Sequence, residues 1–243
     1  KRLVRQILSS HAYRQSSARR EDLHRVDPEN MLMGRANLKR LDAESVRDSL
    51  LVVAGLLNPQ LGGASLPVTE NQEGKTVIGV RKIKDGLKAG VDSGQGDANR
   101  RSLYIQMQRN KPLNMLATFD LPRMTPNCEI RPQTTVATQS LWFMNDSQMV
   151  DWSESMAGSI DADRDDATPW LEDLFVRLFA SLPDKSDKKM CLRYLEEQTH
   201  QFIEDKDPTW QDQLSKDPTL ARKRALATLC QTLVASNRFL YID

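Results

Sequence analysis

Apolar residues recur at helical spacing through the last third of the chain, and this periodicity favours a fold built from packed helices. The longest stripe follows Thr168-Pro169 and contains Leu171, Leu174, Phe175, Leu178, Phe179 and Leu182. Such a stripe is typical of a helix that buries one face. Two more helices are predicted, from about 187 to 204 and from about 218 onward. Short linkers join the three, so residues 168–243 are expected to form an antiparallel helix cluster.

A second strong pattern begins at Asp42, which can cap a helix that runs to about Leu57. Asn58-Pro59 ends this helix. Residues 59–99 then hold eight of the eleven glycines and predict a glycine-rich excursion that is partly β, with a possible short strand at 76–78. The predicted fold class is therefore mainly α, an irregular helical domain that occupies residues 1–243 as a single unit.

The stretch from Arg101 to Asn145 is expected to fold into the middle of the helical body. Residues 102–107 alternate between apolar and polar, which predicts a half-buried strand. A helix is expected to open at Pro112 and to end near Asp120, before a loop over 123–132. Thr134 or Thr135 can then cap a helix that leads to Asn145.

Composition excludes several classes of protein. The chain has 243 residues, is 39% hydrophobic and 28% charged, and carries a formal net charge of +1. This balance allows a real core but gives no global basic excess that would indicate nucleic-acid binding. No apolar run approaches the roughly 18 residues that a membrane span requires. Because the chain begins at Lys1 inside an apparent amphipathic helix, we expect it to be a fragment of a larger parent whose export signal could lie upstream.

The three cysteines, Cys128, Cys191 and Cys230, lack the CxxC or CxxCH spacing of zinc or c-type haem sites. Cys191 and Cys230 fall on apolar helix faces and are expected to be buried thiols. Cys128 lies in a predicted loop, and its pairing state is left open. No motif of a hydrolase, a P-loop or a dinucleotide site occurs either, so no cofactor or catalytic residue is assigned.

Polar residues of the central stretch are the candidate binding site. They are Arg101, Arg109, Asp120, Arg131, Gln139 and Asn145. Arginines near a carboxylate could bind a carbohydrate or an anionic ligand. The same residues could equally form buried pairs that fix loop geometry.

The acidic segment Asp161-x-Asp163-x-Asp165, with Glu172 twelfth, is similar to a calcium loop. However, Asp166 stands where the glycine of such a loop is needed, and Pro169 occupies its ninth place. A solvated acidic approach to a helix N-terminus is the alternative explanation. Glu197-x-x-His200 has half of a bundle metal motif, but no second half occurs, and a surface histidine is expected.

Several blocks together resemble one family. They are Ser9–Ser17, Asp27–Asn30, Arg40–Glu44, Arg47–Leu50, Arg101–Tyr104, Phe119-Asp120, Cys128-x-x-Arg131, Thr134–Gln139, Asn145 and Ser236–Asp243. The chain resembles the helical C-terminal domain of unknown function found in large secreted planctomycete proteins, often beside cytochrome c domains. The resemblance implies export and larger parents, but no known reaction. A haem group is not expected in this chain, because the CxxCH motif that would hold it is absent.

These patterns lead to three functional hypotheses. The first is an accessory interaction or binding module of an exported multidomain protein, with other domains of the parent or its exported neighbours as partners. The second is an enzyme, hydrolytic or acting on polysaccharide, that uses acids such as Asp120 near Arg131. The third is a structural domain steadied by calcium. No nucleic acid and no membrane span are expected in any of them.

Overall fold

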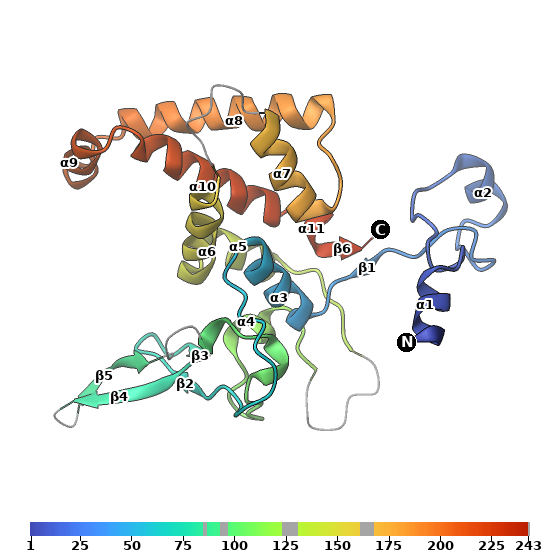
Figure 1. Cartoon of the computed structure of the whole chain (residues 1–243), viewed down its shortest axis with the longest axis horizontal. Helices are drawn as coiled ribbons and strands as arrows, with labels where there is room; N and C mark the ends of the chain where they lie inside the picture. The colour runs from blue at the N-terminus through green and yellow to red at the C-terminus, as the bar shows by residue number, and fades with distance from the viewer. Residues whose placement is uncertain (85–86, 93–96, 123–130, 161–167, 243) are drawn as a thin grey trace. The chain divides into compact units, whose positions relative to one another are not determined.

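The computed structural model describes residues 1–84, 87–92, 97–122, 131–160 and 168–242 (Figure 1). The chain divides into two compact units, one made of residues 1–41 with 240–243 and the other of residues 42–239. The described elements are mainly helical, so the predicted fold class is confirmed. That the whole chain is a single domain cut from a larger parent stays a prediction.

The first unit is closed by pairing between distant parts of the sequence. Its elements are α1 (Arg2–Leu8), α2 (Glu21–Val26), β1 (Lys39–Arg40) and β6 (Tyr241–Ile242). β1 and β6 pair antiparallel, and the Leu41 amide donates to the Leu240 carbonyl at 2.8 Å. Residues 42–239 are therefore an insertion between the two strands that complete the first unit.

The second unit contains most of the helices. They are α3 (Ala43–Val53), α4 (Asn114–Thr118), α5 (Ala137–Asn145), α6 (Ser147–Gly158), α7 (Thr168–Phe179), α8 (Lys185–Glu204), α9 (Pro208–Lys216), α10 (Leu220–Val234) and α11 (Asn237–Leu240), the last of which crosses into the first unit. α10 is central because it packs against α5, α6, α8 and α9. Figure 1 shows α8 and α10 running in opposite directions, as the predicted antiparallel cluster requires. Ala221 and Ala225 of α10 are fully buried, and such small side chains let helices approach closely.

An aromatic cluster fills the core where α4, α5 and α6 meet. Phe119, Trp142, Phe143 and Trp152 lie in successive edge-to-face contacts with ring centroids 5.3–6.3 Å apart. All four side chains are buried. Burial of rings this large dominates the local packing energy.

The glycine-rich excursion is partly β, as predicted. β2 (Val68–Glu70) pairs antiparallel with β3 (Thr76–Ile78), and β4 (Val80–Lys84) pairs with β5 (Leu87–Asp92). A positive φ of 78° at Gly74 makes the tight turn between β2 and β3 possible. The turn carries side chains that matter for the site described below.

The predicted strand over 102–107 is wrong. Residues Ser102–Tyr104 form a 3-10 turn, η2, and Leu103 is exposed rather than buried. Ile105 alone makes an isolated parallel bridge, to Leu66. The alternating pattern failed because burial here is set by polar contacts with α3, which periodicity does not report.

Candidate functional site

A buried arginine of α3 holds the start of the central stretch. Arg47 is 1% exposed, although its neighbours on the helix face, Leu50 and Leu51, are apolar. Its guanidinium donates to the carbonyl of Arg100 at 2.9 Å, to the hydroxyl of Ser102 at 3.2 Å and to the carbonyl of Ala98. Burial lowers the pKa of Arg47 to about 10, and the adjacent Asp48 carboxylate opposes this shift. The side chain remains charged at neutral pH and ties η2 to the helix.

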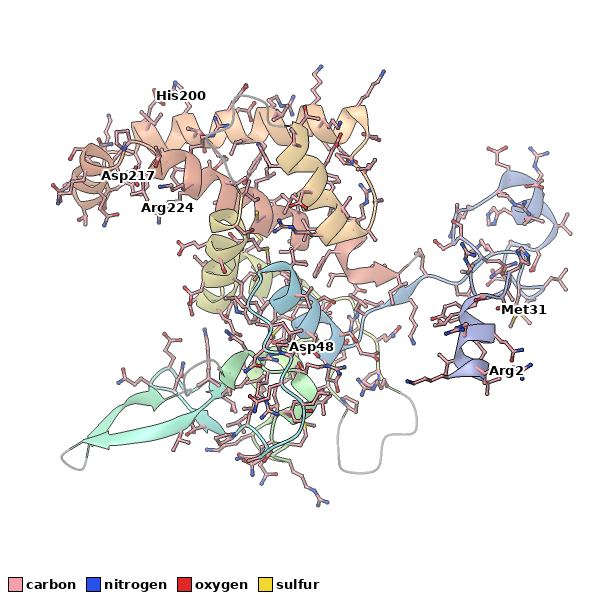
Figure 2. All side chains as sticks on the ribbon, in the orientation of Figure 1. Arg2, Met31, Asp48, His200, Asp217 and Arg224 are labelled. Atoms are coloured by element: carbon pink, nitrogen blue, oxygen red, sulfur yellow. The ribbon has the colours of Figure 1, made fainter. Side chains whose placement is uncertain are left out.

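Asp48 completes this contact from the next position of α3. Its Oδ1 accepts from the Ser102 amide at 2.7 Å and from the Ser102 hydroxyl at 2.6 Å. Figure 2 labels Asp48 in α3. Arg101, a candidate binding residue, lies with its Nε 3.8 Å from Asp48 Oδ2 and has a side chain that is 49% exposed. Arg101 therefore stands at the outer edge of a structural contact.

Arg100 makes a second buried contact that sequence analysis missed. It is 4% exposed, lies 4.0 Å above the ring of Tyr104, and donates to the carbonyls of Gly62 and Ala64. The Gly62 amide in turn donates to the Tyr104 hydroxyl at 2.8 Å. Planar donors of this kind satisfy several carbonyls at once. The result fixes residues 62–66 beside residues 99–106.

The fold brings Asp120 and Gln139, two of the candidate residues, into contact. Asp120 has a positive φ of 65° and follows the end of α4. Its carboxylate accepts from the amide of Thr134 at 2.7 Å, from the Thr134 hydroxyl at 2.8 Å and from Gln139 Nε2 at 3.5 Å. Gln139 also donates to the Thr118 carbonyl at 3.1 Å. These bonds tie the end of α4 to the approach to α5, which is a structural use of the carboxylate.

Arg131 pairs with α3 through a forked contact. Its two terminal nitrogens donate to the two carboxylate oxygens of Glu44 at 2.7 and 3.1 Å, and Asp42 lies 3.9 Å away. Burial alone would raise the pKa of Glu44, but the hydrogen bonds and charge of Arg131, with a backbone hydrogen bond, lower it overall. A bidentate pair of this kind has high geometric specificity.

Arg109 and Asn145 are exposed, and the six candidate residues therefore occupy several places. Asp120 and Gln139 share one cluster, Arg131 contacts the start of α3, and Arg101 lies near Asp48. A ligand-binding role for these residues stays a prediction.

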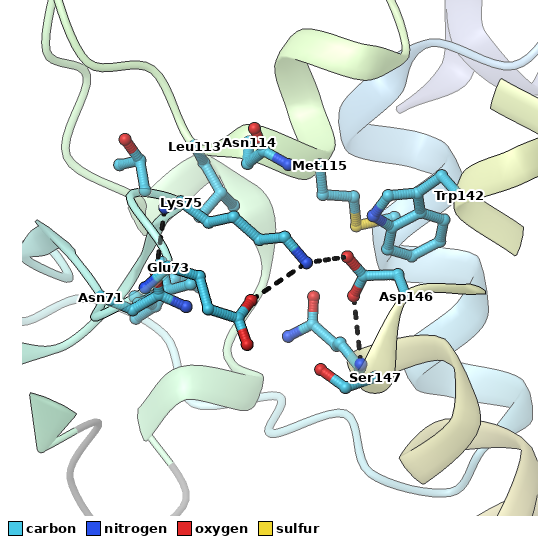
Figure 3. Close-up of a pocket in the computed structure, with 13 residues that line it drawn as sticks. Asn71, Glu73, Lys75, Leu113, Asn114, Met115, Trp142, Asp146 and Ser147 are labelled. Carbon is cyan, nitrogen blue, oxygen red and sulfur yellow. Dashed lines mark hydrogen bonds and ion pairs between the residues drawn. The ribbon is translucent and has the colours of Figure 1, made fainter. Parts of the chain in front are cut away.

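A pocket of about 130 Å³ lies beside the aromatic cluster (Figure 3). Three segments form its wall: the turn between β2 and β3, the start of α4, and the junction of α5 with α6. Figure 3 shows the Lys75 ammonium between the carboxylates of Glu73 and Asp146. The Nζ–oxygen distances are 3.3 and 3.5 Å. The charge of Asp146, followed by hydrogen bonding to Glu73, raises the pKa of Lys75. The sequence alone does not indicate this pocket, because the residues that line it are far apart in the chain.

Other candidate chemistry receives little support from the described residues. No group of three or more His, Cys, Asp or Glu side chains is gathered within the described ranges as a metal site. The calcium-like segment falls mainly on residues 161–167, outside those ranges, as does Cys128. Cys191 and Cys230 are buried free thiols, as predicted. His200 is exposed, with its Nδ1 3.3 Å from Glu204, so the surface assignment is confirmed. Among the described helices, none combines the length and apolarity needed to cross a bilayer.

Comparison with known proteins identifies a family. Residues 1–195 match the family model PSD1, described as a protein of unknown function (DUF1553). Neither a curated protein nor a solved structure matches the chain significantly. The match extends from the first unit through α3, the central stretch and the pocket, and into α8. The chain therefore belongs to the PSD1 (DUF1553) family of proteins of unknown function.

Proposed function

We propose that the chain is an accessory interaction module of an exported multidomain protein, and that residues 1–41 form its main contact surface. One observation carries the proposal. Among residues 1–41, all of which the structure describes, no apolar side chain is buried. About forty residues without an apolar core are not expected to be stable by themselves, so a partner surface is expected to cover them.

The apolar side chains of α1 lie on adjacent turns. Leu3, Val4, Ile7 and Leu8 are each about half exposed or more. Their spacing is that of a helix face made to pack against a partner. Contiguous exposed apolar surface marks interaction sites in soluble proteins.

A second apolar group is presented by an ordered turn. Met31, Leu32 and Met33 are 74–80% exposed. The Asp27 carboxylate accepts from the amides of Met31 and Leu32 at 2.9 and 2.7 Å. Asn30, with a positive φ of 55°, donates to the Arg35 carbonyl and to the Asn37 side chain, both at 2.9 Å. Because hydrogen bonds hold the backbone of this turn, its apolar side chains are kept in an exposed position.

Charge indicates the chemistry of the partner. Residues 1–41 contain ten Lys or Arg and four Asp or Glu, although the whole chain is nearly neutral. Figure 2 labels Arg2 and Met31, one basic and one apolar residue of this unit. The proposed occupant is an acidic protein surface with an apolar centre, belonging to another domain of the parent protein. Complementary charge of this kind gives specificity and speeds association.

Photocrosslinking in the parent protein tests the proposal. A crosslinking amino acid at Leu32 should capture a segment outside residues 1–243, and the same group at His200, an exposed position of α8, should not. Capture confined to residues 42–239, or capture equal at the two positions, would refute the proposed contact.

A matched pair of variants separates binding from folding. With the crosslinking amino acid at Met31 instead, Leu32→Asp should abolish capture and leave the melting temperature unchanged, because both side chains are about 80% exposed. Leu61→Asp, at an equally exposed leucine of the second unit, is the control and should affect neither.

Export is proposed from the resemblance to secreted proteins alone. Fractionation of cells that produce the full-length parent should place the protein outside the cytoplasm. Recovery in the cytoplasmic fraction alone would contradict this part of the proposal.

A further inference from the structure

The pocket beside Trp142 has the composition of a small-ligand site. Its polar wall offers amides of Asn71, Asn114 and Gln148, and the hydroxyl of Ser147. Its apolar wall includes Leu113, Met115 and Trp142, all buried. A concave site with an apolar floor and a few convergent polar groups is the usual form of a ligand pocket. We propose that this pocket binds one neutral sugar residue.

The hydrogen-bonding groups match hydroxyls, which both donate and accept. The Lys75 ammonium has three donors, and the carboxylates of Glu73 and Asp146 account for two of them. The third donor serves a ligand oxygen. Asp146 retains acceptor capacity, since its Oδ1 accepts from the Gln148 amide at 3.1 Å and a carboxylate oxygen can accept a second hydrogen bond.

The turn that carries these groups is held in place before any ligand arrives. Asn71 Oδ1 accepts from the amides of Glu73 and Lys75 at 3.0 and 2.9 Å. This leaves the amide NH2 of Asn71 as a pair of donors on the pocket wall (Figure 3). Asp146 is likewise fixed as the N-cap of α6. A site held in this way binds with less loss of conformational freedom.

Charge and size exclude the obvious competing ligands. Lys75, Glu73 and Asp146 together carry one net negative charge, which repels phosphate and sulfate. A ligand amine would have to compete with Lys75 for the same two carboxylates. The volume of about 130 Å³ is close to the roughly 150 Å³ of a cavity that takes a benzene-sized ring, so there is room for one six-membered ring and not for the two rings of a disaccharide. The indole of Trp142 gives the C–H face of the sugar an apolar neighbour.

The test is protein-observed NMR on the full chain with glucose, galactose, mannose, xylose and N-acetylglucosamine. At least one sugar should shift the Trp142 indole signal, assigned with Trp142→Phe, at a dissociation constant of about 1–10 mM. Sodium sulfate, sodium phosphate and methylammonium chloride are the competing probes. The proposal is overturned if no sugar shifts this signal, or if one of these ions shifts it at the same concentration as strongly as any sugar does.

Two variants locate the binding. Asn114 is exposed at the first position of α4, where alanine does not weaken the helix, so Asn114→Ala should weaken sugar binding about fivefold and leave the fold intact. Asn110→Ala, an exposed residue of the same type outside the pocket, should leave affinity unchanged. Equal affinity of the wild type and Asn114→Ala would place the sugar elsewhere and refute the site. A negative result for sugar binding would not contradict the contact proposed for residues 1–41, because that contact is measured separately by crosslinking.

Discussion

The buried guanidinium of Arg47 makes the sharpest prediction about stability. Arg47→Met keeps a long side chain of apolar character but removes the donors to the carbonyls of Ala98 and Arg100 and to the Ser102 hydroxyl. Each buried carbonyl left without a donor costs about 1–3 kcal/mol, whereas the hydroxyl still donates to Asp48. The loss is partly offset, because methionine does not carry the desolvation cost of a buried charge. We expect the free energy of unfolding of residues 42–239 to fall by about 3 kcal/mol.

The assay is urea denaturation followed by tryptophan fluorescence. All four tryptophans lie within residues 42–239, so the signal reports that unit alone. Arg47→Lys retains the positive charge but has fewer directed donors, so it should lower the free energy of unfolding by about 1–2 kcal/mol. The matched control is Arg101→Ala, whose half-exposed side chain lies 3.8 Å from Asp48 and should change stability by less than about 0.5 kcal/mol. A loss below about 1 kcal/mol for Arg47→Met, or an equal loss for Arg101→Ala, would show that this contact does not anchor the central stretch.

Further predictions concern Asp120, the pair of Arg131 with Glu44, and the buried thiols. Asp120→Ala should lower the free energy of unfolding by about 2 kcal/mol, which is measured as a lower melting temperature. Asp120→Asn should lower it by about half as much, because asparagine tolerates the positive φ and keeps one acceptor oxygen. Equal effects of the two variants would contradict this reading. Arg131→Ala should raise the pKa of Glu44, measured by NMR titration, and should cost about 0.5 kcal/mol. Because the folded pKa is lowered from 4.5, this contribution is present above pH 4.5 and is lost as the pH falls through the folded value, so a pH-independent difference would refute it. Burial raises the pKa of Cys191 to about 11 and that of Cys230 to about 12, so with the third cysteine replaced by serine neither thiol should react with a disulfide reagent at pH 8 until denaturant is added. Their contribution to stability is present below about pH 9 and is lost as the pH rises towards 11–12; rapid modification of the native chain would contradict the burial.

Helices with long apolar stripes could be predicted from the sequence. The helix expected from Asp42 is α3, and those expected in the last third are α7, α8 and α10. α9 was missed, although Asp207 followed by Pro208 is a recognisable start signal, because the segment is polar apart from Trp210 and Leu214. Periodicity thus finds helices that bury a broad face and overlooks those anchored by one large side chain.

Polar contacts between distant segments could not be predicted in the same way. Arg47 lies on the apolar face of α3, and nothing in its neighbourhood indicates that its partners are carbonyls more than fifty residues away. Glu44 likewise finds Arg131 across 87 positions. The pocket has the same origin, since Lys75 meets Asp146 only after the turn between β2 and β3 packs near the start of α6. Residue type and local spacing carry no information about contacts between residues that are far apart in the sequence.

The pairing of β1 with β6 has a consequence for how force and motion pass through the molecule. The backbone runs out of the first unit at residue 41 and returns to it at residue 240, and these two crossing points are joined by a hydrogen bond. A pull applied between the units is therefore shared by two covalent connections instead of one. Because the Leu41 amide donates to the Leu240 carbonyl, the segment 42–239 begins and ends at neighbouring points of the backbone. It could therefore be excised and its two ends joined by a short linker, with new termini opened elsewhere, as in a circular permutant.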